Sequence, residues 1–329
     1  MKFGPVPIAD ALGAIAAHSW RKGDAKIRKG AVVNADDIAA LTAAGVGEIT
    51  VAILGPDDLH EDAAATALAA ALVQDPAGAQ LRLTTAATGR VNVYATAEGL
   101  VQLDPAAIAA FNAVDPMITV ATVPPQHRLP EGGMVATIKV ISYGVPKAHV
   151  TRACQSGATL ALATGQVRSV TMIETTTDGS DPSEKGRRAL NGRLTPLGAH
   201  LTPRVIVRHE IDPLAQAIAD APGEVICILT ASATSDAHDV APSALRHVGG
   251  KVARFGMPVD PGNLLFIGDL HGKTVIGLPG CARSPALNGA DWVLNRVLCG
   301  IPVSSADIAA MGVGGLLKEI PTRPRPRAG

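Results

Sequence analysis

The chain has 329 residues, and its 29 Lys and Arg are balanced by 29 Asp and Glu, so the formal net charge is zero. A neutral chain lacks the basic field that draws proteins to nucleic acid or anionic lipid. Aromatic residues make up only 2% of the chain, too few to stack single-stranded bases. Composition therefore argues against a nucleic-acid or membrane partner, and the length predicts two domains.

The cysteines and the apolar runs predict a cytoplasmic protein. Cys154, Cys227, Cys281 and Cys299 are widely spaced and form no CxxC pair, which favours a reducing compartment over a zinc or redox centre. The start of the chain lacks an apolar signal core. The longest apolar runs, such as residues 63–73, are far shorter than the ~20 residues that span a bilayer.

The first half, residues 1–166, is predicted to be a mixed α+β region. Asn34 and Asp104 are placed to cap helices, with Pro105 at the first helical position. Helices are expected at residues 35–44, at 61–73 and after Pro105, with strands at 48–54, 91–95, 99–103, 117–123 and 134–141. We expect strands 91–95 and 99–103 to form a hairpin.

From residue 167 to residue 302, predicted strands and helices alternate. Strands are expected at 170–173, 204–207, 225–229, 264–267 and 274–278, and the last two are expected to pair across His271 and Gly272. Helices are expected at 186–197, 214–219, 242–248 and 288–298, the second of them capped by Asp212 and Pro213. This alternation predicts an α/β fold with a mostly parallel sheet and helices on both faces. In such folds ligands bind at the carboxyl ends of the strands. Residues 303–329 form a C-terminal extension, and the alternating Pro and Arg of 319–329 favour an extended segment.

The loop after strand 225–229 is rich in small and polar residues. Its polar side chains include Thr230, Ser232, Thr234, Ser235, Asp236 and Asp239. The small residues allow a phosphate to approach the backbone, the hydroxyls can bind it, and Asp236 and Asp239 are candidate ligands for a divalent cation. The alternative is an ordinary turn in which Asp239 caps the next helix.

A second loop follows strand 274–278 and contains Gly277, Pro279, Gly280, Cys281, Arg283 and Ser284. Pro279 fixes a turn, Gly280 permits close approach, and Arg283 is suited to bind an anionic group. Cys281 is interpreted as a small buried thiol rather than a nucleophile, because no His adjoins it in sequence.

A third loop and a group of basic residues follow strand 170–173. Residues 174–179 include Asp178, and the basic group consists of Lys185, Arg187, Arg188 and Arg193. At a strand end these residues favour an anionic ligand, although such arginines are often only a solvated helix face. Together the three loops predict a site for a phosphorylated ligand with Mg²⁺.

The order of these motifs resembles the molybdopterin-binding domain shared by molybdopterin adenylyltransferases and molybdopterin molybdenumtransferases. The resemblance covers residues 168–300 and rests on segments 225–242, 257–262 and 270–280, the last of which ends in Gly-Leu-Pro-Gly. In the first half, residues 8–17 resemble the molybdenumtransferase's opening helix, 29–33 a strand and 37–46 the segment that follows. The remainder is similar to a divergent bacterial subgroup in which a nucleotidyltransferase domain often follows, so segment 319–329 is expected to lie where that domain would be attached.

The resemblance implies roles for particular residues. It places Asp239, Asp212 and Asp178 at acidic positions that hold metal or orient an oxyanion. It places Pro279 and Gly280 on the turn against the pterin phosphate, and Arg187 on a family arginine. The chain departs from the family in two loops and before Arg187: Ala231, Ser232 and Ala233 replace paired glycines, Cys281-Ala282 replaces Asn-Pro, and Gly186 replaces an Asn.

Two functions follow from the resemblance. The first is an enzyme of molybdenum-cofactor biosynthesis that binds molybdopterin, adenylated or not, with Mg²⁺ and assists molybdate insertion. The second is a non-catalytic carrier of molybdopterin that serves a molybdenum-cofactor nucleotidyltransferase or an apo-molybdoenzyme. The retained aspartates favour the first function and the altered loops favour the second. The resemblance also implies a homodimer.

Overall fold

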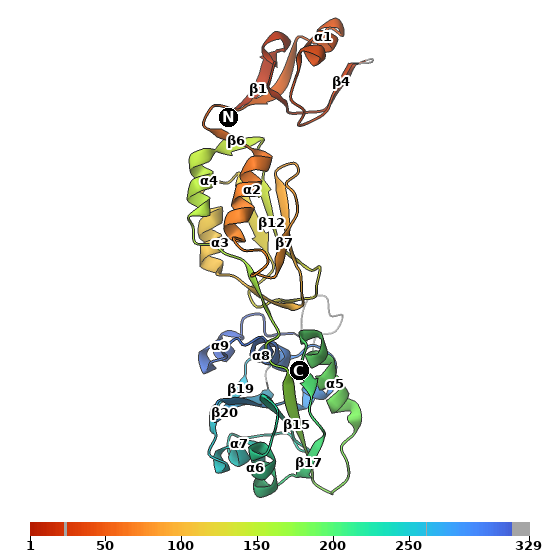
Figure 1. The fold of residues 1–329 in the computed structure, drawn as a ribbon, viewed down its shortest axis with the longest axis vertical. Helices are drawn as coiled ribbons and strands as arrows, with labels where there is room; N and C mark the ends of the chain where they lie inside the picture. Colours follow the sequence, from red (N-terminus) through yellow and green to blue (C-terminus); the bar gives the residue numbers. More distant parts are fainter. Residues whose placement is uncertain (23–24, 261, 318–329) are drawn as a thin grey trace, which may run out of the picture. The chain divides into compact units, whose positions relative to one another are not determined.

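The computed structural model describes residues 1–22, 25–260 and 262–317, so the prediction for the Pro- and Arg-rich segment 319–329 lies outside the described residues. The chain divides into two compact units (Figure 1). Unit 1 comprises Met1–Ala97 and Val101–Leu162, and unit 2 comprises Glu98–Leu100 and Ala163–Gly329. The expected domain boundary after residue 166 falls just inside unit 2.

The first part of unit 1 has a small core of its own, to which Ile8, Leu41 and Val51 belong. Its elements are β1 (Lys2–Pro7), η1 (Ile8–Asp10), β2 (Ile15–Ala16), β3 (Trp20–Lys22), β4 (Ala25–Ile27), α1 (Ala35–Ala43) and β5 (Glu48–Ile53). The Asn34 side chain accepts a hydrogen bond from Asp37 N–H and begins α1 as expected.

Two expectations for this part are wrong. Residues 8–17 form no opening helix, because after the short turn η1 the backbone at Gly13 takes φ +76°, a left-handed conformation that ends a helix. Residues 29–33 form no strand, and Val32 makes only an isolated antiparallel bridge with Ile15.

The rest of unit 1 packs three helices with short sheets, and two of the strands given below, Gly99–Gln102 and Ala161–Thr164, belong in part to unit 2. The elements are β6 (Asp58–His60), α2 (Glu61–Leu72), β7 (Leu81–Leu83), β8 (Arg90–Ala95), β9 (Gly99–Gln102), α3 (Pro105–Asn112), β10 (Ile118–Thr122), β11 (Arg128–Leu129), β12 (Met134–Val140), β13 (Gly144–Pro146), α4 (Lys147–Cys154) and β14 (Ala161–Thr164). The expected hairpin is wrong: β8 pairs with β7 and β12, whereas β9 belongs to a sheet with β11 and β14. The chain leaves β8 with Ala95 N–H bonded to Gly133 O and Thr96 N–H bonded to Gln80 O, so its backbone groups are already paired elsewhere.

Unit 2 contains a seven-stranded sheet and helices, which confirms the α/β class. Its elements are β15 (Ser169–Thr176), α5 (Glu184–Leu194), η2 (Thr195–Leu197), β16 (His200–Leu201), β17 (Val205–Arg208), α6 (Ile211–Ala219), β18 (Val225–Leu229), α7 (Val240–His247), β19 (Lys251–Met257), β20 (Asn263–Leu270), β21 (Lys273–Gly277), η3 (Gly280–Arg283), α8 (Gly289–Leu298) and α9 (Ser305–Ala310). Strand β15 pairs in parallel with β16, β17 and β18, and β18 pairs in parallel with β21. Strands β20 and β19 complete the sheet in antiparallel pairings. The sheet is therefore mixed.

Alternating side chains of the sheet bury into two different cores. On β18, Val225, Cys227 and Leu229 pack with residues of α5 and α8, whereas Ile226 and Ile228 pack with residues of α6 and α7. Because successive residues of a strand point to opposite faces, the helices cover both faces of the sheet. Every residue of β18 is buried, as its continuous apolar sequence indicates.

Among the differences from expectation in unit 2, three concern β15, α6 and β19. Strand β15 continues to Thr176, so Glu174 and Thr175, expected in a loop, are buried strand residues. Helix α6 begins at Ile211 after Glu210, so Asp212 lies inside the first turn and is not the cap. Strand β19 was not expected; in the structure it pairs with β20, and the register shifts twice along the pair.

Candidate functional site

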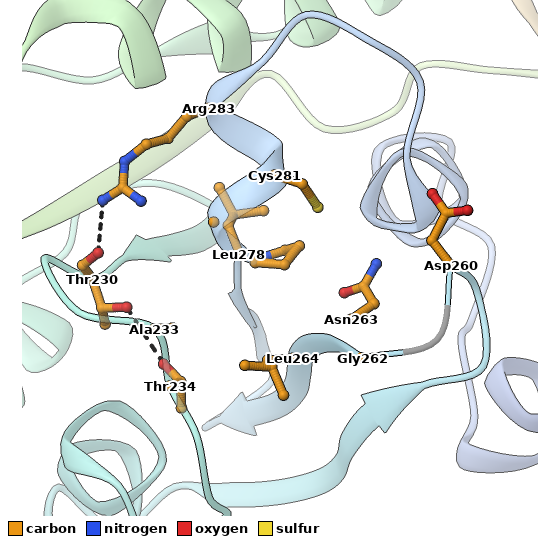
Figure 2. Close-up of a pocket in the computed structure, with 12 residues that line it drawn as sticks. Thr230, Ala233, Thr234, Asp260, Gly262, Asn263, Leu264, Leu278, Cys281 and Arg283 are labelled. Carbon is orange, nitrogen blue, oxygen red and sulfur yellow. Dashed lines mark hydrogen bonds between the residues drawn. The ribbon is translucent and has the colours of Figure 1, made fainter. Parts of the chain in front are cut away.

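A pocket of about 270 Å³ lies in unit 2 beyond the ends of β18 and β21 (Figure 2). Three segments contribute its walls: the loop after β18, the start of β20 and the turn after β21. The lining residues are Thr230, Ala233, Thr234, Asp260, Gly262, Asn263, Leu264, Leu278, Pro279, Gly280, Cys281 and Arg283.

Strand register explains why these three segments meet. In the parallel pair β18–β21, Ile228 lies opposite Gly277, so the loops that follow the two strands leave the same edge of the sheet. In the antiparallel pair β20–β21, Phe266 lies opposite Gly277. The start of β20 therefore lies beside the end of β21, and Asn263 comes to the edge where the two loops are.

The turn after β21 is held from behind by a buried arginine. Arg193 on α5 is 8% exposed, and its Nε lies 2.5 Å from Asp291 Oδ1 on α8. Its remaining N–H groups donate to four carbonyl oxygens, those of Ala189, Ala282, Ser284 and Ala286. The sequence grouped Arg193 with ligand-facing cations; the structure instead pairs it with a carboxylate and uses it to fix the backbone next to Arg283.

The loop after β18 forms the opposite wall. Arg283 Nη2 donates to Thr230 O at 2.7 Å and joins the two walls, as Figure 2 shows. The hydroxyls of Thr230 and Thr234 lie 3.4 Å apart. The loop is also held by the Ala231 N–H, which donates to the hydroxyl of Thr175 on β15 at 2.8 Å.

Asn263 supplies an unsatisfied donor to the pocket. The residue is 6% exposed, and its Oδ1 accepts a hydrogen bond from Leu265 N–H at 3.2 Å. Because a backbone N–H only donates, this bond fixes the orientation of the side-chain amide. The nitrogen Nδ2 is buried and has no hydrogen-bond partner within the described residues. Figure 2 shows it directed into the space between Cys281 and Asp260.

Five of the residues expected to bind the ligand line this pocket. These are Thr230, Thr234, Pro279, Gly280 and Arg283. The other six do not: Ser232, Ser235, Asp236, Gly277, Ser284 and Arg187. Gly277 lies within β21, where a Cβ would come within 2.0 Å of the Phe266 ring, so packing alone requires a glycine there. Ser284 Oγ accepts from Ala286 N–H.

Arg187 lies on α5 and contacts a backbone carbonyl. Its Nη2 donates to Thr202 O at 2.7 Å, while its Nη1 is buried without a partner within the described residues. Thr202 follows β16, and neither residue is part of the pocket lining. The structure therefore does not bring Arg187 together with the five lining residues.

The expected metal ligands Asp236 and Asp239 are engaged with their own loop. Asp239 Oδ1 accepts Val240 N–H at 2.7 Å and caps α7, and its Oδ2 accepts Ser235 N–H at 2.9 Å. Asp236 Oδ1 accepts His238 N–H at 2.7 Å. Within the described residues no group of three or more His, Cys, Asp or Glu side chains could hold a metal ion. The magnesium site therefore remains a prediction that rests on two carboxylates.

The other two expected acidic residues lie apart from the pocket lining. Asp212 Oδ1 is 3.7 Å from His247 Nε2, and both side chains are largely exposed. Asp178 accepts hydrogen bonds from the Ser180 hydroxyl, from Ser180 N–H and from the Thr176 hydroxyl. These bonds lower the pKa of Asp178 to about 2.

Sequence reasoning did not select several of the lining residues. Asp260, Gly262, Asn263, Leu264, Leu278 and Cys281 were not among the expected ligand-binding residues, nor was Ala233. The pairing of the last two long strands could have identified the start of β20. Once β20 and β21 are expected to form a hairpin, the residue that begins β20 must lie beside the residue that follows β21.

Comparisons with known proteins add three findings. A family described as a domain of unknown function (DUF8806) matches residues 5–53, the segment that contains the small separate core of unit 1. The search of curated proteins found no significant match. Among solved structures, the chain is similar to the molybdopterin biosynthesis MoeA protein from Pyrococcus horikosii, with 15% identity and a TM-score of 0.29, over 93% of this chain and 75% of that one. That TM-score is too low to establish a common fold.

No helix in the described part of the chain is both long and apolar enough to span a membrane.

Proposed function

We propose that unit 2 binds molybdopterin in the pocket beyond β18 and β21, and that the chain serves molybdenum-cofactor biosynthesis. One observation carries this proposal. The three segments whose sequences resemble the molybdopterin-binding family, 225–242, 257–262 and 270–280, each contribute lining residues to the same pocket. Three segments that are not contiguous in sequence thus form one site.

The chemistry of the lining suits a phosphorylated pterin. The Arg283 guanidinium has five N–H donors, and among the described residues its one hydrogen bond goes to Thr230 O, so further donors can serve an anionic oxygen. The Asn263 amide offers an unpaired N–H to a ring nitrogen or carbonyl oxygen. Leu264, Leu278 and Pro279 provide apolar surface for a flat ring.

Within this proposal, one observation favours a carrier over an enzyme that inserts molybdate. Both carboxylate oxygens of Asp239 accept backbone N–H bonds that organise the loop and cap α7. A Mg²⁺ ion bound to Asp239 would share these oxygens with two N–H groups, whose positive ends repel the cation. Carriage needs the pocket alone, whereas assisted insertion and adenylation also need this carboxylate or another to engage a metal.

Equilibrium dialysis of the full chain against molybdopterin tests the binding proposal. We expect wild-type protein to retain the pterin and Arg283→Gln to bind it at least about ten-fold more weakly, since a charge-assisted hydrogen bond is lost. The matched control is Arg188→Gln, which removes an exposed arginine from α5. Failure of the wild-type chain to retain pterin, or equal retention by Arg283→Gln, contradicts the proposal.

A second experiment separates the carrier from the enzyme. Purified chain loaded with molybdopterin is incubated with Mg²⁺, molybdate and ATP, and the pterin product is followed by mass spectrometry. A carrier returns the pterin unchanged. Formation of adenylated pterin or of the molybdenum complex, above the rate without protein, identifies a transferase and overturns the preference for carriage.

A further inference from the structure

The four cysteines of the chain have different surroundings. Cys227 on β18 is fully buried, and burial raises its pKa to about 12. Cys299 is also buried. Cys154 in unit 1 is half-buried; burial raises its pKa, and its thiol lies 3.8 Å from Ala67 O. Cys281 is half-buried too, but it lies in the wall of the pocket in unit 2.

The pocket gives the Cys281 sulfur both space and a polar neighbour. Figure 2 shows the sulfur directed toward the part of the pocket that the Asn263 nitrogen also faces. An amide N–H that is buried without a hydrogen-bond partner destabilises the folded state. A group that carries an acceptor oxygen and enters this space removes that destabilisation by pairing with Asn263 Nδ2. The unpaired amide therefore offers a hydrogen-bond donor to an acceptor group bound beside the thiol.

We propose that Cys281 is a modification site that takes up the thiol half of an anionic, low-molecular-weight peptide disulfide, of which oxidised glutathione is the example we test. The Cys281 thiolate attacks one sulfur of the disulfide. The sulfur–sulfur bond of the reagent breaks, a new one forms to Cys281, and the departing thiolate takes up the proton that Cys281 released. The disulfide itself is the oxidant, so electrons balance.

The attached group is of the kind that the pocket can hold. A peptide thiol carries carbonyl and carboxylate oxygens, which accept hydrogen bonds from Asn263 Nδ2 and from the Arg283 guanidinium. The pocket volume of about 270 Å³ accommodates part of such a group, and its polar remainder extends into solvent. This site does not depend on the molybdopterin proposal, because it requires only the pocket, the thiol and the amide.

The other three cysteines of the chain provide a comparison for the reactivity of Cys281. Thiol–disulfide exchange requires both the thiolate and access for the disulfide. Cys227 and Cys299 lack access, and for Cys154 the raised pKa reduces the thiolate fraction. In the full chain, Cys281 should therefore react with the disulfide before the other three cysteines do.

The experiment follows the full chain with oxidised glutathione at mildly alkaline pH, by intact mass and by peptide mapping over time. We expect the first adduct on the peptide that contains Cys281, formed at least about ten-fold faster than the adduct on Cys154. Cys281→Ser should lose the fast adduct, and the matched control Cys154→Ser should retain it. Equal rates at Cys281 and Cys154, or parallel modification of Cys227 and Cys299, overturn the proposal, because the reaction then reflects general exposure or unfolding.

A second variant tests the role of the amide. Asn263→Asp keeps the oxygen that accepts Leu265 N–H but replaces the free donor with a negative oxygen, so the fast reaction should slow by at least about five-fold. Thermal unfolding establishes that the variant is folded. An unchanged rate in a folded variant shows that Asn263 does not take part and overturns the proposed site. Neither experiment contains a pterin, so their outcome is independent of the molybdopterin test.

Discussion

The two walls of the pocket are held in different ways. Behind the turn Gly280–Arg283, the guanidinium of Arg193 pairs with Asp291 and binds four carbonyl oxygens, and both side chains are buried. Across the pocket, Ala231, Ser232 and Ala233 are exposed, and their loop is held by a few hydrogen bonds, among them the one from Ala231 N–H to Thr175. The first wall is held by a buried ion pair together with hydrogen bonds, whereas the second is held by hydrogen bonds alone.

This difference matters because removing one partner of a buried ion pair lowers the free energy of unfolding more than removing one hydrogen bond of a loop. Removing one partner of a buried ion pair leaves the other charge without compensation and costs about 3–5 kcal/mol. Removing one hydrogen bond of a loop costs about 1 kcal/mol. The turn after β21 should therefore keep its shape whether or not a ligand is bound, while the loop after β18 can adjust to the ligand.

The largest expected effect is that of Arg193→Met, which removes the first wall's support. Asp291 would remain buried, and we expect the free energy of unfolding to fall by about 3–5 kcal/mol. Urea denaturation measures this, with Arg188→Met as the control, because Arg188 is exposed on the same helix.

Hydrogen exchange on Arg193→Met then separates the two walls. Amides of residues 281–286 should exchange faster than in the wild type, while those of residues 231–235 should change little. A loss of stability below about 1 kcal/mol, or equal changes in both walls, would show that Arg193 does not hold the turn in the way that its contacts indicate.

Thr175→Val should have a smaller effect, confined to the second wall. Valine fills nearly the same volume but offers no acceptor to Ala231 N–H and no hydroxyl to His209 Nδ1, which lies 3.0 Å away. We expect a loss of about 1 kcal/mol and faster exchange of the Ala231 amide. Thr177→Val, at an exposed position just after β15, is the control. Faster exchange in the turn at residues 281–286 instead would contradict the separation of the two walls.

Local signals in the sequence predicted the elements that depend on local physics. The continuous apolar run of residues 225–229 gave the bounds of β18, and Asn34 and Asp104 began α1 and α3 by side-chain capping. The wrong hairpin at residues 91–103 shows where this fails. Which strand pairs with β8 is decided by partners such as β12, distant in sequence, and no local residue pattern specifies them.

In the candidate site too, some features could be predicted from the sequence and others depend on tertiary packing. Loops after β18 and β21 could be placed at one edge because parallel strands end together. A sequence does not reveal whether a carboxylate faces a ligand or its own backbone, and Asp239 proves to bind two backbone N–H groups. Nor does it distinguish Arg193, buried against Asp291, from Arg188, exposed on the same helix. Both outcomes depend on tertiary packing.

Asp239 allows a test of whether the second wall also binds a metal. Asp239→Ala should cost about 1 kcal/mol of stability through loss of the cap on α7, and Asp239→Asn about half of that, because asparagine keeps one acceptor oxygen but not the second, which binds Ser235 N–H. Calorimetric titration with Mg²⁺ provides the second measurement. If the carboxylate holds magnesium, wild-type protein gives a binding isotherm that Asp239→Asn lacks; if both proteins give none, Asp239 is a cap only.

The smallest expected effect concerns Asp178, in the loop that follows β15. The Ser180 hydroxyl, Ser180 N–H and the Thr176 hydroxyl hold its pKa at about 2, below the ordinary value of 3.8. A pKa that is lower in the folded state stabilises the fold at pH values above 3.8, and this contribution is lost as pH falls through about 2. We expect Asp178→Asn to lower Tm slightly at neutral pH, because the side chain is exposed and solvent screens it.

The Tm difference between wild type and Asp178→Asn should be constant above about pH 5, shrink below about pH 4 and disappear near pH 2. Scanning fluorimetry across this range measures it, with Asp181→Asn, an exposed aspartate of the same loop, as the control. A difference that persists unchanged at pH 2 would mean that the ionised carboxylate is not the source of the stabilisation. A large difference at neutral pH would mean that this surface loop is coupled to the core as strongly as the turn held by Arg193, and the contrast between core-held and surface-held loops at this edge of the sheet would then fail.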